Sequence, residues 1–268
     1  MYAGTTLHGK SGGIIGVHQR IDRIARRDLR RLPGVGHGFP TITQILHFEG
    51  NNGPDGIKRK SPSVDEPWHF IDPTKRDDHE IIQQIRDHYD NLVMALKTRN
   101  NERAAFEAAW MAHAITDGLT PAHHYPLSDK IEELWGKPKE DRLTIREKNI
   151  IKGETRRQTV SKNWEYWGAK GVFLTHGLFE FGVATSIKTT RFEKTTPSAA
   201  WLRMADAKGL EKLFLDAVHA IYALNMYEHF WKTGWSTKLA RQTRESLIPR
   251  IVNVVTYAWY SAYREAGL

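Results

Sequence analysis

Three pairs of residues, each a histidine with an acidic residue four positions later, have the clearest chemical potential in this sequence. The pairs are His18 with Asp22, His113 with Asp117, and His176 with Glu180. Residues four apart share one face of a helix, where an imidazole and a carboxylate can bind the same metal ion. With thirteen histidines and odds of 31 in 268 for an acid at each such position, about 1.5 pairs arise by chance. The pairs therefore need support from their surroundings.

The surroundings of the second pair supply further candidate ligands. A proline-containing turn follows Asp117 and leads to His123, which can fold back toward His113. Upstream, the segment Gly-Asn-Asn-Gly-Pro-Asp ends at Asp55, and the segment Trp-His-Phe-Ile-Asp-Pro contains His69. Because the chain has no cysteine, any transition metal must be held by imidazole and carboxylate groups.

This series of motifs resembles the zinc-dependent phospholipase C family and, more distantly, the S1/P1-type nucleases that share its fold. The resemblance consists of a histidine on the first helix, a Gly-x-x-Gly-Pro-Asp turn, a His-Phe-x-Asp-Pro segment, a His-x3-Asp-x5-His motif and a later His-x3-Glu. The five motifs occur in the family's order between His18 and Glu180, which is about 60% of the chain.

The resemblance implies two or three bound zinc ions, of which two would share a carboxylate. One zinc would be held by His69, His113 and Asp117. A third zinc would use the same Asp117 carboxylate as a bridge and add His18. A carboxylate between two zinc ions is stabilised by their combined charge, which agrees with this assignment.

The second zinc and the catalytic groups are assigned by the same resemblance. The second zinc would be held by His123, His176 and Glu180. Asp55 would lie beside the bridging water, either as a ligand or as the general base. Phe70, next to a ligand, would pack on a substrate headgroup or a nucleotide base.

The chain departs from the family pattern at two places. The family's mature chain begins with a tryptophan whose amino group and carbonyl complete the third site, whereas the first tryptophan here is Trp68. His8 or a processed terminus would have to complete that site, or the site is empty. The stretch between His123 and His176 is also longer than in the phospholipases, so residues 129–169 are interpreted as an inserted excursion.

Helical periodicity dominates the elements that must position these residues. We expect an all-α protein, a single domain over residues 1–268, of the zinc-dependent phospholipase C or P1 nuclease type. A long loop is expected from residue 33 to about 77. Helices are expected over 14–31, 78–98, 102–118 and 170–187, with two or three more from about 198 to the end.

Three functions remain open at this stage. The first is a zinc phosphodiesterase that hydrolyses phospholipid headgroup esters. The second is a single-strand-directed zinc nuclease, which the formal net charge of +8 favours. The third is a non-enzymatic protein with a degenerate metal site whose basic surface binds an anionic membrane or a partner; the missing N-terminal tryptophan supports it.

The sequence also bears on location. No run of eighteen apolar residues occurs, so we expect no transmembrane segment. The N-terminus shows no charged-then-apolar leader pattern, so the protein would be cytoplasmic, or secreted if a leader has been removed.

Overall fold

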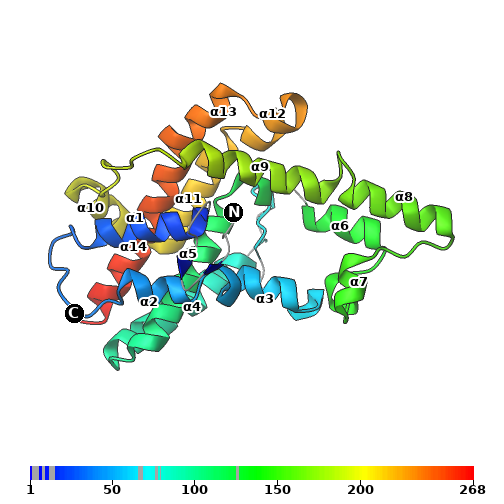
Figure 1. Cartoon of the computed structure of the whole chain (residues 1–268). Coiled ribbons are helices and arrows are strands. Elements are labelled where there is room, and N and C mark those ends of the chain that lie inside the picture. The colour runs from blue at the N-terminus through cyan, green and yellow to red at the C-terminus, as the bar shows by residue number, and fades with distance from the viewer. Residues whose placement is uncertain are drawn as a thin grey trace.

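The computed structural model describes most of the chain, and the described part is almost entirely helical (Figure 1). The described residues are 1, 6–7, 10–11, 16–65, 69–75, 78, 80–124 and 127–268. The short strands β1 (Thr6–Leu7) and β2 (Lys10–Ser11) pair antiparallel. The expectation of an all-α single domain is confirmed, and its assignment to the phospholipase C type stays a prediction.

The centre of the molecule is a helical bundle. Its central members are α1 (Val17–Leu29), α4 (Glu80–Lys97), α5 (Asn101–Gly118) and α14 (Ile248–Glu265). Helix α14 packs against the other three, and the side chain of Trp259 on α14 is fully buried. Asn100 caps α5, because its side chain accepts a hydrogen bond from the backbone N–H of Arg103. Helices α1, α4 and α5 begin and end within three residues of the expected positions.

The expected long loop contains two short helices, α2 (Ile42–His47) and α3 (Pro54–Lys60). Helix α2 begins at a capping box, in which the side chains of Thr41 and Gln44 each accept a hydrogen bond from the other residue's backbone N–H. Helix α3 starts at a proline, which suits the first helical position. The 3-10 turns η1 (Gly50–Asn52) and η2 (Ser63–Asp65) flank α3.

A lobe projects from one side of the bundle (Figure 1, right). It comprises α6 (Leu127–Trp135), η4 (Lys139–Asp141), α7 (Ile145–Asn149) and α8 (Arg156–Trp167). The lobe has a small hydrophobic core of its own, formed by Phe70, Leu134, Trp135, Ile151, Tyr166 and Val172. This lobe covers the stretch interpreted as an excursion, and its status as an insertion stays a prediction.

Helix α9 (Val172–Ile187) runs from the lobe to the bundle (Figure 1). Phe179 and Val183 are buried on its inner face. Gly182 allows the Trp235 ring to pack directly on the helix, since a Cβ there would lie 2.2 Å from that ring. The remaining helices, which complete the bundle, are α10 (Ala199–Lys208), α11 (Leu210–Tyr222), α12 (Met226–Thr233), α13 (Thr237–Gln242) and the π-helical turn η5 (Thr243–Leu247).

Within the described ranges, no helix combines the length and apolar character needed to cross a bilayer.

Candidate metal centre

Helices α1, α5 and α9 and the 3-10 turn η3 (Pro121–His123) bring six of the expected ligands together in two groups of three. In each group, the ligand atoms lie within 4.8 Å of one another. We call them the inner group, His18, His113 and Asp117, and the outer group, His123, His176 and Glu180. Each group therefore offers imidazole and carboxylate atoms that could hold a metal ion.

The inner group is buried and is organised around a single carboxylate. Oδ1 of Asp117 lies 3.2 Å from Nε2 of His18, and Oδ2 lies 3.3 Å from Nε2 of His113. The two imidazole rings stack with centroids 3.9 Å apart and planes 11° from parallel. Asp117 thus presents one oxygen to each histidine, as a bridging carboxylate does.

The outer group is organised around Glu180. Its Oε1 lies 3.1 Å from Nε2 of His123 and 2.9 Å from Nε2 of His176. These two imidazoles also stack, with centroids 4.8 Å apart. The side chains of His176 and Glu180 are each 13% exposed, so this group lies nearer to solvent than the inner one.

Two of the histidines have their tautomers set by a partner on the other ring nitrogen. Nδ1 of His123 donates to the backbone carbonyl of His69 at 2.7 Å. Nδ1 of His113 lies 3.4 Å from both carboxylate oxygens of Glu49. In each case Nε2 is left facing the group's carboxylate, and a partner on the other ring nitrogen is typical of metal-binding histidines.

Unpaired nitrogens provide a further test of whether a metal fits. Neither ring nitrogen of His18 makes a hydrogen bond with the described residues, because its 3.2 Å contact with Asp117 is not aligned for one. Nδ1 of His176 is likewise without such a bond. Buried polar atoms normally have partners, so unsatisfied imidazole nitrogens beside carboxylates fit a cation site.

The α-amino group of Met1 is buried between the two groups. It contacts Oδ1 of Asp117 and lies 3.4 Å from Oε1 of Glu180. Burial lowers the pKa of this amino group, but the carboxylates of Asp117, Glu180 and Asp55 more than compensate, and the net pKa is raised. His8 and Trp68, which entered the argument about the third site, lie outside the described residues.

The carboxylates of both groups stay ionised. Burial alone would raise the pKa of Asp117, but the Met1 amino group and the neighbouring imidazoles hold it well below its usual value. Burial alone would also raise the pKa of Glu180, but the Met1 amino group and His176 lower it to well below its usual value. Ionised carboxylates are the form in which these side chains bind metals.

The imidazoles differ in their preferred charge. Burial lowers the pKa of His18 and lowers that of His123 to about 4, so both are neutral near pH 7 and can bind a metal. His113 is the exception. Burial lowers its pKa, but the charges of Glu49 and Asp117 outweigh this and raise it well above the usual value. His113 therefore has to lose a proton when it binds a metal ion.

The other expected site residues lie beside the two groups. Oδ1 of Asp55 is 3.8 Å from Nε2 of His113, and its side chain is 30% exposed. Nε2 of His69 is 2.7 Å from Nζ of Lys58, and its ring lies 5.3 Å from that of His123. Phe70 is 9% exposed and belongs to the core of the lobe. None of the three belongs to either ligand group among the described residues, and their proposed roles stay predictions.

Sequence reasoning missed Glu49. This carboxylate is fully buried at the start of η1, directly before the Gly-Asn-Asn-Gly-Pro-Asp turn. The only signal for it was an acidic residue adjoining a motif. Asp22, which is four positions after His18, is buried on α1, and burial and the charge of Glu49 raise its pKa well above the usual value. Both carboxyl groups interact with the charge of His113.

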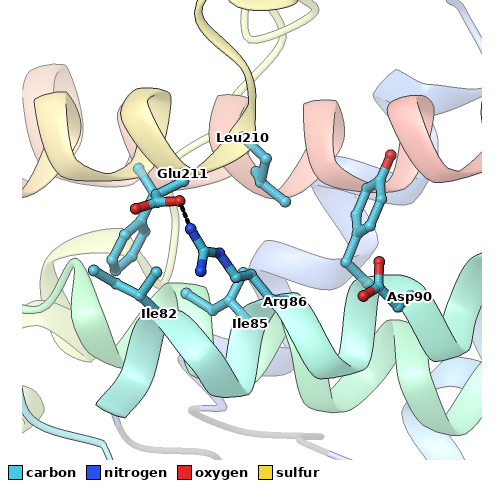
Figure 2. A pocket seen from close by; sticks show the side chains of 8 residues that line it. Ile82, Ile85, Arg86, Asp90, Leu210 and Glu211 are labelled. Atoms are coloured by element: carbon cyan, nitrogen blue, oxygen red, sulfur yellow. Dashed lines mark hydrogen bonds and ion pairs between the residues drawn. The ribbon is translucent and has the colours of Figure 1, made fainter. Parts of the chain in front are cut away.

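A separate groove lies between α4 and α11 (Figure 2). It has a volume of about 290 Å³ and is lined by Ile82, Ile85 and Leu210 among others. An ion pair between Arg86 and Glu211 crosses it, as Figure 2 shows. The lining includes none of the candidate ligands, and it carries one basic residue, Arg86, and two acidic ones, Asp90 and Glu211.

Comparison of this chain with protein-family models, curated proteins and solved structures finds no match.

Proposed function

We propose that this chain is a zinc-dependent phosphoric ester hydrolase of the phospholipase C type, which cleaves phospholipid headgroup esters. The observation that carries the proposal is the position of Asp117. Its two oxygens face His18 and His113 separately, and its helix continues into the turn that carries His123. One carboxylate thus has imidazoles on both sides, as the resemblance implies for the bridging residue.

The contacts support two of the three ligand sets of the proposal. His18 lies on the Oδ1 side of Asp117, and His113 lies on the Oδ2 side. His69, which the resemblance adds to the set of His113 and Asp117, lies instead 2.7 Å from Nζ of Lys58. The outer group supplies the remaining set.

The chain's own residues have distinct tasks in the proposed reaction. Zinc, when bound, lowers the pKa of a water and stabilises the negative charge that develops on the phosphoryl oxygens. Asp55, half-exposed beside His113, accepts the proton of the attacking water. Glu49 and the carbonyl of His69 hold His113 and His123 in the orientation that ligation needs.

The test measures zinc and activity on the same purified protein. Elemental analysis should give at least two zinc ions per chain, and phosphatidylcholine should be hydrolysed with release of phosphocholine. Activity on single-stranded DNA without activity on the lipid would replace the phospholipase assignment with the nuclease one. A chain with neither zinc nor either activity after incubation with zinc would contradict the proposal and favour the non-enzymatic alternative.

A matched pair of variants shows whether the activity belongs to this site. Asp117→Asn should abolish it, whereas Asp87→Asn, which changes an exposed aspartate on α4, should retain it. Equal activity in both variants would show that the hydrolysis does not depend on Asp117.

A further inference from the structure

Large apolar side chains are exposed along α8 and α9. Trp164 is 71% exposed and Phe181 is 54% exposed, and the other members of the surface are also well exposed. We call it the apolar face, and it consists of Val160, Trp164, Trp167, Phe173, Leu178 and Phe181. On α8, the members lie three or four residues apart and so share one side of the helix. Soluble proteins rarely leave such a surface uncovered without a binding role.

The two helices contribute to one continuous surface. The rings of Trp167 on α8 and Phe173 on α9 are in contact, with centroids 4.6 Å apart. Both side chains are themselves substantially exposed, so the contact joins the two exposed faces. In Figure 1 the two helices follow one another from the bundle, below α12 and α13, to the far end of the lobe.

The charges next to the apolar face are predominantly positive. Residues 156–188 contain five basic residues and two acidic ones, and one of the acids, Glu180, belongs to the outer ligand group. Arg156 and Arg157 are exposed at the N-terminal end of α8, and Lys188 is exposed where α9 ends. Helices that lie in a membrane interface have this composition, with tryptophan, phenylalanine and leucine next to arginine and lysine.

We infer that the apolar face docks this protein on an anionic lipid surface. The apolar side chains enter the boundary between headgroups and acyl chains, and the basic residues contact the anionic headgroups. A second copy of the chain is a poorer occupant. A symmetric dimer places the same patch against itself, and so brings the positive charges of both copies together.

The docking surface rests on the proposed function for its purpose. Leu178 of the apolar face lies two residues from both His176 and Glu180 of the outer group, and therefore on the opposite side of α9 from these two ligands. A protein held to the bilayer by this helix has its outer ligand group on the side of α9 that faces away from the lipid.

The experiment measures binding of the purified full chain to vesicles by flotation, separately from hydrolysis. The parent should bind vesicles of phosphatidylcholine with phosphatidylserine more tightly than vesicles of phosphatidylcholine alone, and less tightly as salt increases. A variant with Val160→Ser, Trp164→Ser and Phe181→Ser should lose about tenfold or more of its binding. Met94→Ser is the matched control, because Met94 is similarly exposed but lies on α4.

The possible outcomes are separable. Circular dichroism establishes that the serine variant is folded, and hydrolysis of a soluble phosphodiester should be the same in the variant and the parent. Equal vesicle binding by the parent and the folded serine variant would overturn the inference. The inference would also be overturned if the parent did not bind vesicles and light scattering showed a dimeric parent and a monomeric serine variant. That result would assign the apolar face to a second copy of the chain. If hydrolysis is absent but vesicle binding depends on the face, the docking surface stands and the proposed function fails.

Discussion

The inner and outer ligand groups have the same composition, two histidines and a carboxylate, but they are built differently. The inner group joins α1 and α5, two helices of the bundle, and its side chains are buried. The outer group joins a short 3-10 turn to α9 at the base of the lobe, and two of its three members are partly exposed. The inner group is therefore fixed by the packing of the main core, whereas the outer group depends on a turn and on a helix at the edge.

This difference implies different roles. Ligands on packed helices hold their geometry without a metal, so the inner group is expected to be preorganised. Ligands near solvent leave room for water or for a phosphate ester, so the outer group is where the substrate would enter. The residue that couples the two is Asp117, because it belongs to the inner group and its Oδ1 also lies 3.8 Å from Nδ1 of His123.

The largest effect is expected from Asp117→Asn, which acts on both groups at once. The change keeps the shape but removes the charge that faces His18 and His113. Zinc content should fall by more than one ion per chain, and activity should fall roughly a thousandfold or more. Elemental analysis and initial rates with a soluble phosphodiester provide the measurements. Retention of full zinc content and activity would remove Asp117 from its bridging role and separate the two groups.

A change confined to the outer group should be milder, because the main core does not depend on it. Glu180→Gln removes the charge shared by His123 and His176. We expect the loss of about one zinc per chain, a strongly reduced rate, and a melting temperature that changes less than in Asp117→Asn. Elemental analysis and thermal unfolding of the two variants under the same conditions test this. A larger loss of stability in Glu180→Gln would reverse the comparison and make the outer group the structural one.

The sequence was sufficient to pair the residues that lie one helical turn apart. Spacing of four placed His113 with Asp117 and His176 with Glu180 on helix faces, and the structure brings each pair together. The helices expected between residues 14 and 187 also agree, because their apolar periodicity is regular, whereas the two or three helices expected after residue 198 are five. These are properties of neighbouring residues, which a single sequence contains.

The sequence was insufficient where contacts join distant segments. The Met1 amino group lies beside Asp117, 116 positions away in the sequence, and no local pattern connects the two. Glu49 supports His113 across 64 positions, and no local pattern connects the two. The small core of the lobe depends on Phe70, which comes from a segment far from α6 and α8 in the sequence. Tertiary packing, not local spacing, determines such contacts.

The variant Glu49→Gln tests whether the inner group is preorganised by the carboxylate behind His113. The glutamine keeps the size of the side chain but removes the charge next to Nδ1 of His113. Zinc affinity should fall about 10–100-fold, as for other carboxylates that orient a ligating histidine. Competition with a chelator measures this, and Glu102→Gln on α5 is a control because that glutamate is exposed. Unchanged affinity would show that packing of α5 alone orients the imidazole.

The smallest effect is expected at His124, in the turn between the two groups. Its ring is buried, and its Nε2 donates to the carbonyl of Gly118 at 2.8 Å, which ties the turn to the end of α5. Burial lowers the pKa of His124 to about 4, from an ordinary value of 6.5. The folded protein therefore binds the proton less readily than the unfolded chain. The stabilisation is complete above pH 6.5 and is lost as the pH falls toward 4.

The magnitude follows from the two pKa values. At about pH 5 the folded state should have lost about 2 kcal/mol through His124 relative to neutral pH. Urea unfolding of the parent and of His124→Gln, both with the same zinc content, measures the free energy of unfolding at the two pH values. The variant cannot take up this proton, so its stability should fall by about 2 kcal/mol less than that of the parent. Equal losses of unfolding free energy in both proteins would mean that the His124 ring is not buried and bonded to Gly118 at neutral pH. The turn would then not tie the outer group to the end of α5 through His124.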